Sequence, residues 1–172
     1  MTALHTRRGI TTGTIAALGV LAMGRSARAI APYIEDKADK VHSFSRTSLH
    51  QEVDFAVPPH RIYDALLDEK QFAAITGLPA KIDRNAGGTL WMFGGRILGR
   101  NIELVPDRRI VQAWRESDWP LGVYSVVHFE LVLKGSGTHM VFDQTGFQPG
   151  NFWHLNPGWY LRYWNPLKAY LK

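Results

Sequence analysis

The chain has 172 residues, of which 45% are hydrophobic and 20% charged, a composition typical of a soluble globular protein. Its formal charge of +5 belongs mainly to the first 29 residues, which carry four arginines and no acid, so that 16 basic and 15 acidic residues remain. This near balance argues against a nucleic-acid partner, and the absence of cysteine excludes disulfides, thiolate metal sites and cysteine chemistry.

The first 29 residues have the pattern of an export signal. Arg7-Arg8 precedes a moderately apolar run from Ile10 to Met23, which is shorter than the roughly 20 residues that a membrane-spanning helix needs. Ala27-Arg28-Ala29 matches the small-residue pattern of a signal cleavage site. These features resemble a twin-arginine signal, so we expect the export machinery to carry the precursor, cleavage after Ala29 and a periplasmic product. An uncleaved anchor or a disordered basic tail is the alternative interpretation.

Residues 30–47 are polar and charged, and we interpret them as an N-terminal arm or linker with room for one short helix. The segment Leu49–Val57 alternates apolar and polar residues, which predicts a half-buried strand. Apolar residues then recur at helical spacing in His60–Leu67 and again after Asp68. We therefore expect two short helices after the first strand, the second capped by Asp68 and ended by Gly77.

After Pro79 the pattern changes from helical spacing to short strands separated by turn residues. Strands are expected at residues 80–83, 89–93, 97–104, 109–115, 124–133 and 138–147. The glycine pairs Gly87-Gly88 and Gly94-Gly95 are typical of hairpin turns that need a positive φ. Short connections between successive strands predict an antiparallel meander.

The last segment predicts a long helix with one buried face, because apolar and aromatic residues recur at helical spacing from Trp159 to Leu171. Pro166 inside this segment predicts a kink near residues 162–165. The order of elements predicts an α+β fold, in which a curved antiparallel sheet of about six to seven strands wraps around the C-terminal helix. Such an arrangement leaves an interior space between sheet and helix.

Several segments, in this order, resemble a known family: Val57–Leu66, Phe93–Gly99, Glu103–Arg115, Gly137-Thr138, Gly158-Trp159 and Tyr163–Leu167. Residues 48–172 resemble the START-like, or SRPBCC, superfamily, and within it the bacterial proteins similar to the activator of heat-shock-protein-90 ATPase. The resemblance implies a helix-grip fold with a cavity under the helix. It implies no catalytic residue, because this superfamily includes cyclases, lipid carriers, hormone receptors and chaperone partners on one scaffold.

The candidate ligand-binding residues are those expected to face the space between sheet and helix. Met140, Phe142 and Gln144 share one face of their strand, and Phe129 shares a face with its apolar neighbours on the preceding one. The predicted lining comprises Met92, Trp114, Phe129, Met140, Phe142, Gln144, Trp159 and Tyr163. One interpretation is an aromatic pocket in which Gln144 orients a ligand. The other is a filled core in which backbone or water satisfies Gln144.

Catalytic and metal motifs are missing from the sequence. The seven histidines show no HxxxH or HExxH spacing, and no nucleophile elbow, phosphate loop or dinucleotide fingerprint is present, so we expect no metal and no cofactor. Glu103, Glu116, Asp118 and Asp143 are expected on outward faces or loops, which leaves catalytic residues unassigned. The loop at Trp119-Pro120 is expected to cover the pocket mouth or to pack on its rim.

We predict an exported START-like domain that binds a small hydrophobic or amphipathic molecule and has no membrane span in its mature form. Two alternatives remain. The first is an enzyme of the cyclase or dehydratase type that uses the same cavity, although no converging acid–base set is visible. The second is a protein-interaction module of the chaperone-ATPase-activator type, against which the export signal counts, since that chaperone is not expected in the periplasm.

Overall fold

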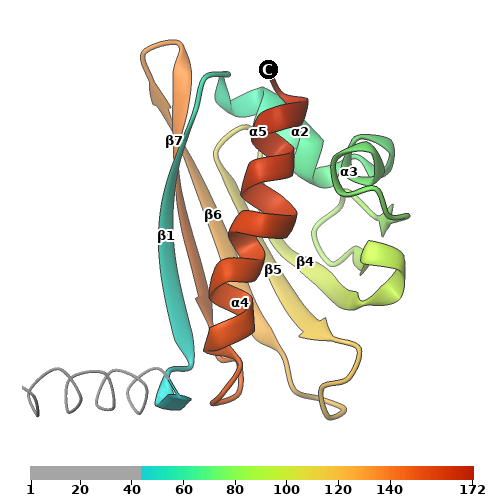
Figure 1. Ribbon diagram of the computed structural model, residues 1–172. Helices are drawn as coiled ribbons and strands as arrows, with labels where there is room; N and C mark the ends of the chain where they lie inside the picture. Colours follow the sequence, from blue (N-terminus) through green and yellow to red (C-terminus); the bar gives the residue numbers. More distant parts are fainter. Residues whose placement is uncertain (1–43) are drawn as a thin grey trace, which may run out of the picture. The chain divides into compact units, whose positions relative to one another are not determined.

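The computed structural model describes residues 44–172. The predicted export signal and nearly all of the predicted arm lie outside the described residues. The described part confirms the α+β prediction, because helices and a single antiparallel sheet are segregated into two layers (Figure 1). Between residues 44 and 172 no helix is both long enough and apolar enough to cross a membrane.

Within residues 44–172 the sheet has seven strands, all joined by antiparallel pairing. They are β1 (Ser48–Phe55), β2 (Lys81–Ile82), β3 (Thr89–Met92), β4 (Ile97–Val105), β5 (Arg109–Glu116), β6 (Ser125–Lys134) and β7 (Gly137–Thr145). Their order in the sheet is β1-β7-β6-β5-β4-β3-β2. The last six strands therefore form the predicted meander, and β1 adds to its far edge beside β7.

Two short helices, α2 (Pro59–Leu67) and α3 (Glu69–Thr76), follow β1 as predicted. Asp68 caps α3, since its carboxylate accepts backbone N–H bonds from Lys70 at 3.1 Å and Gln71 at 2.9 Å. Gly77 ends α3 in the left-handed conformation with φ of 70°. Both predicted helix boundaries around Asp68 and Gly77 are confirmed.

The C-terminal helix lies across one face of the sheet (Figure 1). It consists of α4 (Phe152–Trp159), one wide π-helical turn η2 (Tyr160–Trp164) and α5 (Asn165–Tyr170). The backbone N–H of Asn165 donates to the carbonyl of Tyr160, five residues back, and the dihedral angles of Asn165 stay helical. Pro166 follows directly, at a position where its missing N–H falls in the first turn of α5. A π turn is one of the known causes of a helix kink, so the kink near residues 162–165 stays a prediction.

The core lies between the sheet and the C-terminal helix. The faces assigned inward from the sequence are confirmed, because Met140, Phe142 and Gln144 on β7 and Phe129 on β6 are each at most 2% exposed. Phe129 and Phe142 lie opposite each other in the register of β6 and β7, with ring centroids 5.0 Å apart. The helix contributes Trp159, Tyr163, Trp164, Leu167 and Leu171, all buried.

The predicted hairpin glycines have two different roles. Gly87, Gly94 and Gly95 have φ values of 83°, 67° and 90°, as expected for turns that favour glycine. Gly94 and Gly95 belong to the short 3-10 turn η1 (Phe93–Gly95) between β3 and β4. Gly88 has no positive φ; an added Cβ there would approach Asp83 to 2.6 Å, so this glycine is needed for close packing.

The outward face of β1 and β7 carries alternating histidines and carboxylates. His50 Nδ1 lies 2.7 Å from Asp143 Oδ1, and His139 Nδ1 lies 2.8 Å from Asp54 Oδ1. Glu52 lies between the two histidines, 3.4 Å from His50 and 3.6 Å from His139. The hydrogen bond to Asp143, assisted by Glu52, raises the pKa of His50, and the hydrogen bond from His139 lowers the pKa of Asp54.

This face predicts a pH-dependent effect of His50→Ala on stability. Because the pKa of His50 is raised on folding, its contribution is fully present below the unfolded pKa of about 6.5 and is lost as pH rises through the folded value. Urea unfolding of His50→Ala should therefore show a loss of stability near pH 5.5 and almost none near pH 8.5. The loss should be small, since the His50 side chain is 56% exposed and that of Asp143 39% exposed.

The matched control is His60→Ala, which removes an exposed histidine of α2 that has no ion pair within residues 44–172. It should change stability equally little at both pH values. An equal loss at both pH values for His50→Ala would show that packing, and not the charge on the imidazole, is what the substitution removes.

Candidate functional site

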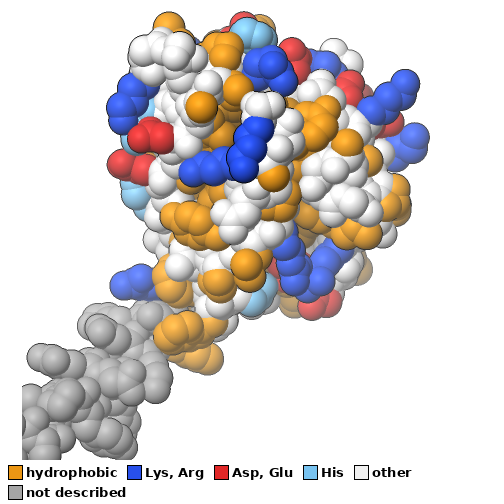
Figure 2. Space-filling model, turned by 45° about the horizontal axis from the view of Figure 1, so that its top comes forward, with side chains coloured by type: hydrophobic (Ala, Val, Ile, Leu, Met, Phe, Trp, Pro, Cys, Tyr) orange, Lys and Arg blue, Asp and Glu red, His pale blue; other side chains and the backbone are white. Residues whose placement is uncertain are grey.

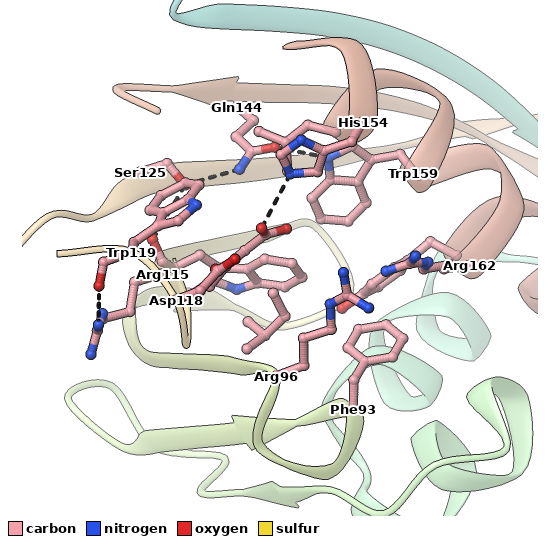
Figure 3. Close-up of a pocket in the computed structure, with 16 residues that line it drawn as sticks. Phe93, Arg96, Arg115, Asp118, Trp119, Ser125, Gln144, His154, Trp159 and Arg162 are labelled. Carbon is pink, nitrogen blue, oxygen red and sulfur yellow. Dashed lines mark hydrogen bonds and ion pairs between the residues drawn. The ribbon is translucent and has the colours of Figure 1, made fainter. Parts of the chain in front are cut away.

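A cavity of about 220 Å³ lies beside the C-terminal helix, between α4, η2 and the ends of β5 and β6 (Figure 3). Its apolar lining comes from Phe93, Ile97, Trp114, Trp119, Leu155, Trp159 and Tyr163. Its polar lining comes from Arg96, Arg115, Glu116, Asp118, Ser125, Gln144, His154 and Arg162. The cavity thus combines aromatic walls with a group of charged side chains.

The aromatic wall is a packed cluster centred on Trp159. Trp114 stacks on Trp159 with ring centroids 4.9 Å apart and an angle of 27°, and Trp164 stacks on it at 5.2 Å and 18°. Tyr163 lies 4.6 Å from Trp159 and 5.4 Å from Phe93. These contacts hold the rings in fixed orientations, so the wall is formed before any ligand arrives.

Each of the three indoles in this cluster donates its N–H to a glutamine. Trp159 Nε1 donates to Gln144 Oε1 at 2.8 Å, Trp114 Nε1 donates to Gln112 Oε1 at 2.8 Å, and Trp164 Nε1 donates to Gln51 Oε1. All three glutamines are at most 5% exposed. Buried indole N–H groups need such acceptors, because an unpaired donor in the core is destabilising.

Gln144 is committed to hydrogen bonds within the fold. Besides accepting from Trp159, it donates from Nε2 to Ser125 Oγ at 2.9 Å, and Ser125 Oγ donates to the Trp114 carbonyl at 3.3 Å. Gln144 is 1% exposed, although it lines the cavity. Its contacts favour the core interpretation: Gln144 fixes the ring of Trp159, and the ring is what a ligand would meet.

The cavity contains four of the eight residues predicted as its lining, namely Trp114, Gln144, Trp159 and Tyr163. The other four, Met92, Phe129, Met140 and Phe142, are buried in the core and do not line it. Phe142 supports the wall from behind, with its ring centroid 4.2 Å from that of Trp159. The sequence indicates which faces point inward, but the cavity occupies only one end of the interior.

The expected outward position of Glu116 is wrong. Glu116 is 9% exposed, lines the cavity, and its Oε2 lies 3.1 Å from His154 Nε2 on α4. Alternation fails here because Trp114, Arg115 and Glu116 at the end of β5 are all buried. The following loop folds over this end, and Arg115 Nη2 donates to the Trp119 carbonyl. Glu103 lies exposed as expected.

The loop after β5 packs against the cavity through Trp119. This agrees with the expectation that the loop at Trp119-Pro120 lies at the cavity. Trp119 is 6% exposed and lines the cavity, whereas Pro120 and Leu121 point to solvent, with Leu121 89% exposed. Asp118 on the same loop is exposed and also reaches the cavity lining. Loop residues therefore form part of the site, which strand periodicity does not indicate.

Two arginines that the sequence did not single out lie on another side of the cavity. Arg96 follows η1 and Arg162 lies in η2, and both are exposed. Figure 3 shows their guanidinium ends turned toward each other. Tyr163 lines the same cavity, and its burial raises the pKa of the phenol well above the usual value, so the hydroxyl stays protonated.

The lining offers one histidine–carboxylate pair, His154–Glu116, and no nucleophile with an adjacent base among the described residues. Within residues 44–172 no group of three or more histidine and acidic side chains could hold a metal ion. The lining also presents an aromatic wall, the phenol of Tyr163 and cationic groups at its edge, all of which can contact a small molecule.

Comparison with known proteins supports this fold assignment. A family model described as "Activator of Hsp90 ATPase homolog 1-like protein" matches residues 56–172. The human protein "Activator of 90 kDa heat shock protein ATPase homolog 1" is 25% identical over 114 residues, which are 66% of this chain and 34% of the human protein. A Dictyostelium discoideum homologue is 30% identical over 113 residues, 65% of this chain and 30% of that protein. The chain spans about a third of the length of these relatives.

Solved structures show the same fold. The crystal structure of an Hsp90 activator from Plasmodium falciparum superposes with a TM-score of 0.69 at 23% identity, covering 72% of this chain and 95% of that one. Protein CV1439 from Chromobacterium violaceum gives a TM-score of 0.58 at 25% identity, covering 73% of this chain and 96% of that one. The matching family model covers more than half of the sequence, and the chain therefore belongs to the Activator of Hsp90 ATPase homolog 1-like family.

Proposed function

We propose that this domain binds a small hydrophobic or amphipathic molecule in the cavity beside the C-terminal helix, and that it does so as an exported, periplasmic protein. The observation that supports binding is the aromatic wall around Trp159, whose indole N–H groups are already satisfied within the fold. A ligand needs only to fill the space and contact the rings, without breaking existing hydrogen bonds. The sequence pattern at Arg7-Arg8 and Ala27–Ala29 supports export.

The test is native mass spectrometry of the protein purified from the periplasm of its own host. We expect the mass of Ile30–Lys172 together with a defined, non-covalent small-molecule adduct. An intact leader on protein found in the cytoplasm would contradict export and would favour a role as a chaperone activator, as in the named relatives.

A cavity-filling variant, Gly158→Leu, should abolish the adduct. Gly158 lines the cavity from α4, has no positive φ, and a Cβ added there would meet nothing within 4 Å. A leucine side chain can therefore enter the empty space without disturbing the helix, and replacing glycine inside a helix favours folding by up to about 1 kcal/mol. The expected result is a folded protein without ligand.

The matched control is Gly158→Ala, which imposes the same backbone restriction but leaves most of the cavity open. It should retain the adduct at the wild-type level. If Gly158→Leu keeps a full complement of adduct, the ligand does not occupy this cavity. If the wild-type protein also gives a clean apo mass under conditions that preserve non-covalent complexes, the binding proposal fails.

A second candidate function is an enzyme of the cyclase or dehydratase type. The observation in its favour is the His154–Glu116 pair on the cavity, because a histidine held by a carboxylate is a common general acid–base arrangement. The mass of the released small molecule separates a carrier from a dehydratase. A carrier returns the molecule unchanged in mass, whereas a dehydratase releases one water and a product that is lighter by that water.

A further inference from the structure

Arg96 and Arg162 form a cationic pair that the fold leaves without a counter-ion. Arg84, Arg108 and Arg109 each make an ion pair with a carboxylate. Arg96 and Arg162 make none with any carboxylate in the described part of the chain. The two guanidinium groups are turned toward each other, so that one anion can contact both (Figure 3).

The pair lies where the cavity meets a second hollow on the surface. This neighbouring hollow, of about 250 Å³, is lined by Thr76, Leu78, Phe93, Arg96, Leu161, Arg162 and Pro166. Phe93, Arg96 and Arg162 line both spaces. Both arginines are exposed and therefore solvated, so they can receive a charged group without a large desolvation penalty. In Figure 2, Lys and Arg side chains likewise lie between hydrophobic patches on one face of the molecule.

Tyr163 lies next to this pair in the cavity lining. The residue is 5% exposed, but its hydroxyl oxygen is not one of the buried polar atoms that lack a partner among residues 44–172, so the oxygen is open to the cavity. Its ring is fixed by Phe93, Trp114 and Trp159. A hydroxyl that is open to the cavity can donate a hydrogen bond to a ligand oxygen.

The acidic groups of the cavity do not cancel this charge. The lining contains three arginines and two carboxylates. Glu116 is paired with His154 at 3.1 Å, and Arg115 donates to the Trp119 carbonyl. Asp118 makes no ion pair within the described residues and lies in the loop on the other side of the cavity (Figure 3). The side formed by Arg96 and Arg162 is therefore free to take an external anion.

We propose that the ligand is an amphipathic anion, of which a medium-chain carboxylate is the simplest form. Arg96 and Arg162 hold its charged head, because guanidinium groups bind carboxylates through paired charge-assisted hydrogen bonds. Its apolar part lies against Trp114 and Trp159, with Tyr163 donating to a head-group oxygen. The cavity is smaller than the roughly 300–1,000 Å³ of sites for drug-sized ligands, which limits the apolar part to a short chain or a single ring system. This inference rests on the proposed binding function.

The experiment compares octanoate with octanamide, which has the same chain and an uncharged head. Each probe is titrated into the ¹⁵N-labelled domain while the indole N–H resonances of Trp114 and Trp159 are followed. Because both indoles line the cavity, a probe that enters it shifts these resonances. Octanoate should bind on the order of tenfold or more tightly than octanamide, and rising salt should weaken octanoate alone.

Arg96→Gln and Arg162→Gln should each weaken octanoate binding about tenfold and leave octanamide binding unchanged. Tyr163→Phe should weaken octanoate by a smaller factor. The matched control is Arg100→Gln on β4, an exposed arginine away from the cavity that also has no ion pair within the described residues; it should change neither probe.

The outcomes distinguish a failure of the anion site from a failure of the proposed binding function. If both probes bind equally well and the arginine variants change nothing, the anion site is wrong while the apolar cavity stands. If neither probe shifts the indole resonances of the wild-type domain, the cavity does not take small molecules and both proposals fall. A loss of octanamide binding in Arg96→Gln would show a structural effect and would also contradict the head-group role.

Discussion

Replacing Trp164 by alanine is expected to lower the free energy of unfolding by about 3–5 kcal/mol. Trp164 is fully buried, stacks on Trp159 at 5.2 Å and packs against Phe142 at 5.2 Å. Its indole N–H also donates to Gln51 on β1, so truncation leaves both a large void and a buried glutamine with one partner fewer. Chemical denaturation monitored by far-UV circular dichroism measures the change.

The control for this prediction is Trp153→Ala on the same helix. Trp153 is 50% exposed, so its loss should cost less than about 1 kcal/mol. Comparable losses for the two substitutions would mean that the helix is held by its exposed side as much as by the sheet. That result would contradict the core described here.

Replacing Gln144 by leucine is expected to lower stability by about 1–3 kcal/mol, although it keeps a similar volume and increases hydrophobicity. The substitution leaves the buried indole N–H of Trp159 without its acceptor at 2.8 Å and deprives Ser125 of a donor. The cost comes from unpaired polar groups and not from lost packing.

A double-mutant cycle with Trp159→Phe tests this explanation. Phenylalanine has no N–H, so in that background Gln144→Leu should cost clearly less than in the wild type. The coupling between the two positions should be about 1 kcal/mol or more. Strict additivity of the two losses would show that the Trp159–Gln144 hydrogen bond does not contribute to stability.

The fold could be predicted from the sequence because its signals are local. Alternation in residues 49–57, the cap at Asp68, the glycine at Gly77 and the helical spacing after Trp159 each depend on neighbours only a few residues away. The inward faces of β6 and β7 followed from the same period of two. Local rules did not indicate the wide π turn that directly precedes Asn165 and Pro166.

The candidate site could be predicted only in part because its residues come from distant segments. Arg96 and Arg162 belong to different elements, and nothing local to either one indicates the other. Glu116 follows Trp114 at a strand end, where the loop carrying Trp119 buries successive residues and the alternation no longer holds. The Trp119-Pro120 loop did indicate part of the site, since a large apolar side chain in a loop commonly packs against the rest of the protein.

The three tryptophan–glutamine pairs make the hydrogen bonds of the interior independent of pH, unlike the ion pairs on the outer face of the sheet. Amides and indoles neither gain nor lose a proton over the pH range in which proteins are folded, whereas His50 and Asp54 on the outer face titrate. A change in acidity therefore acts on the edge of the sheet and leaves the orientation of the rings around Trp159 unaltered. The shape of the aromatic wall is therefore insensitive to pH, because its indoles are held by hydrogen bonds to amides that do not titrate.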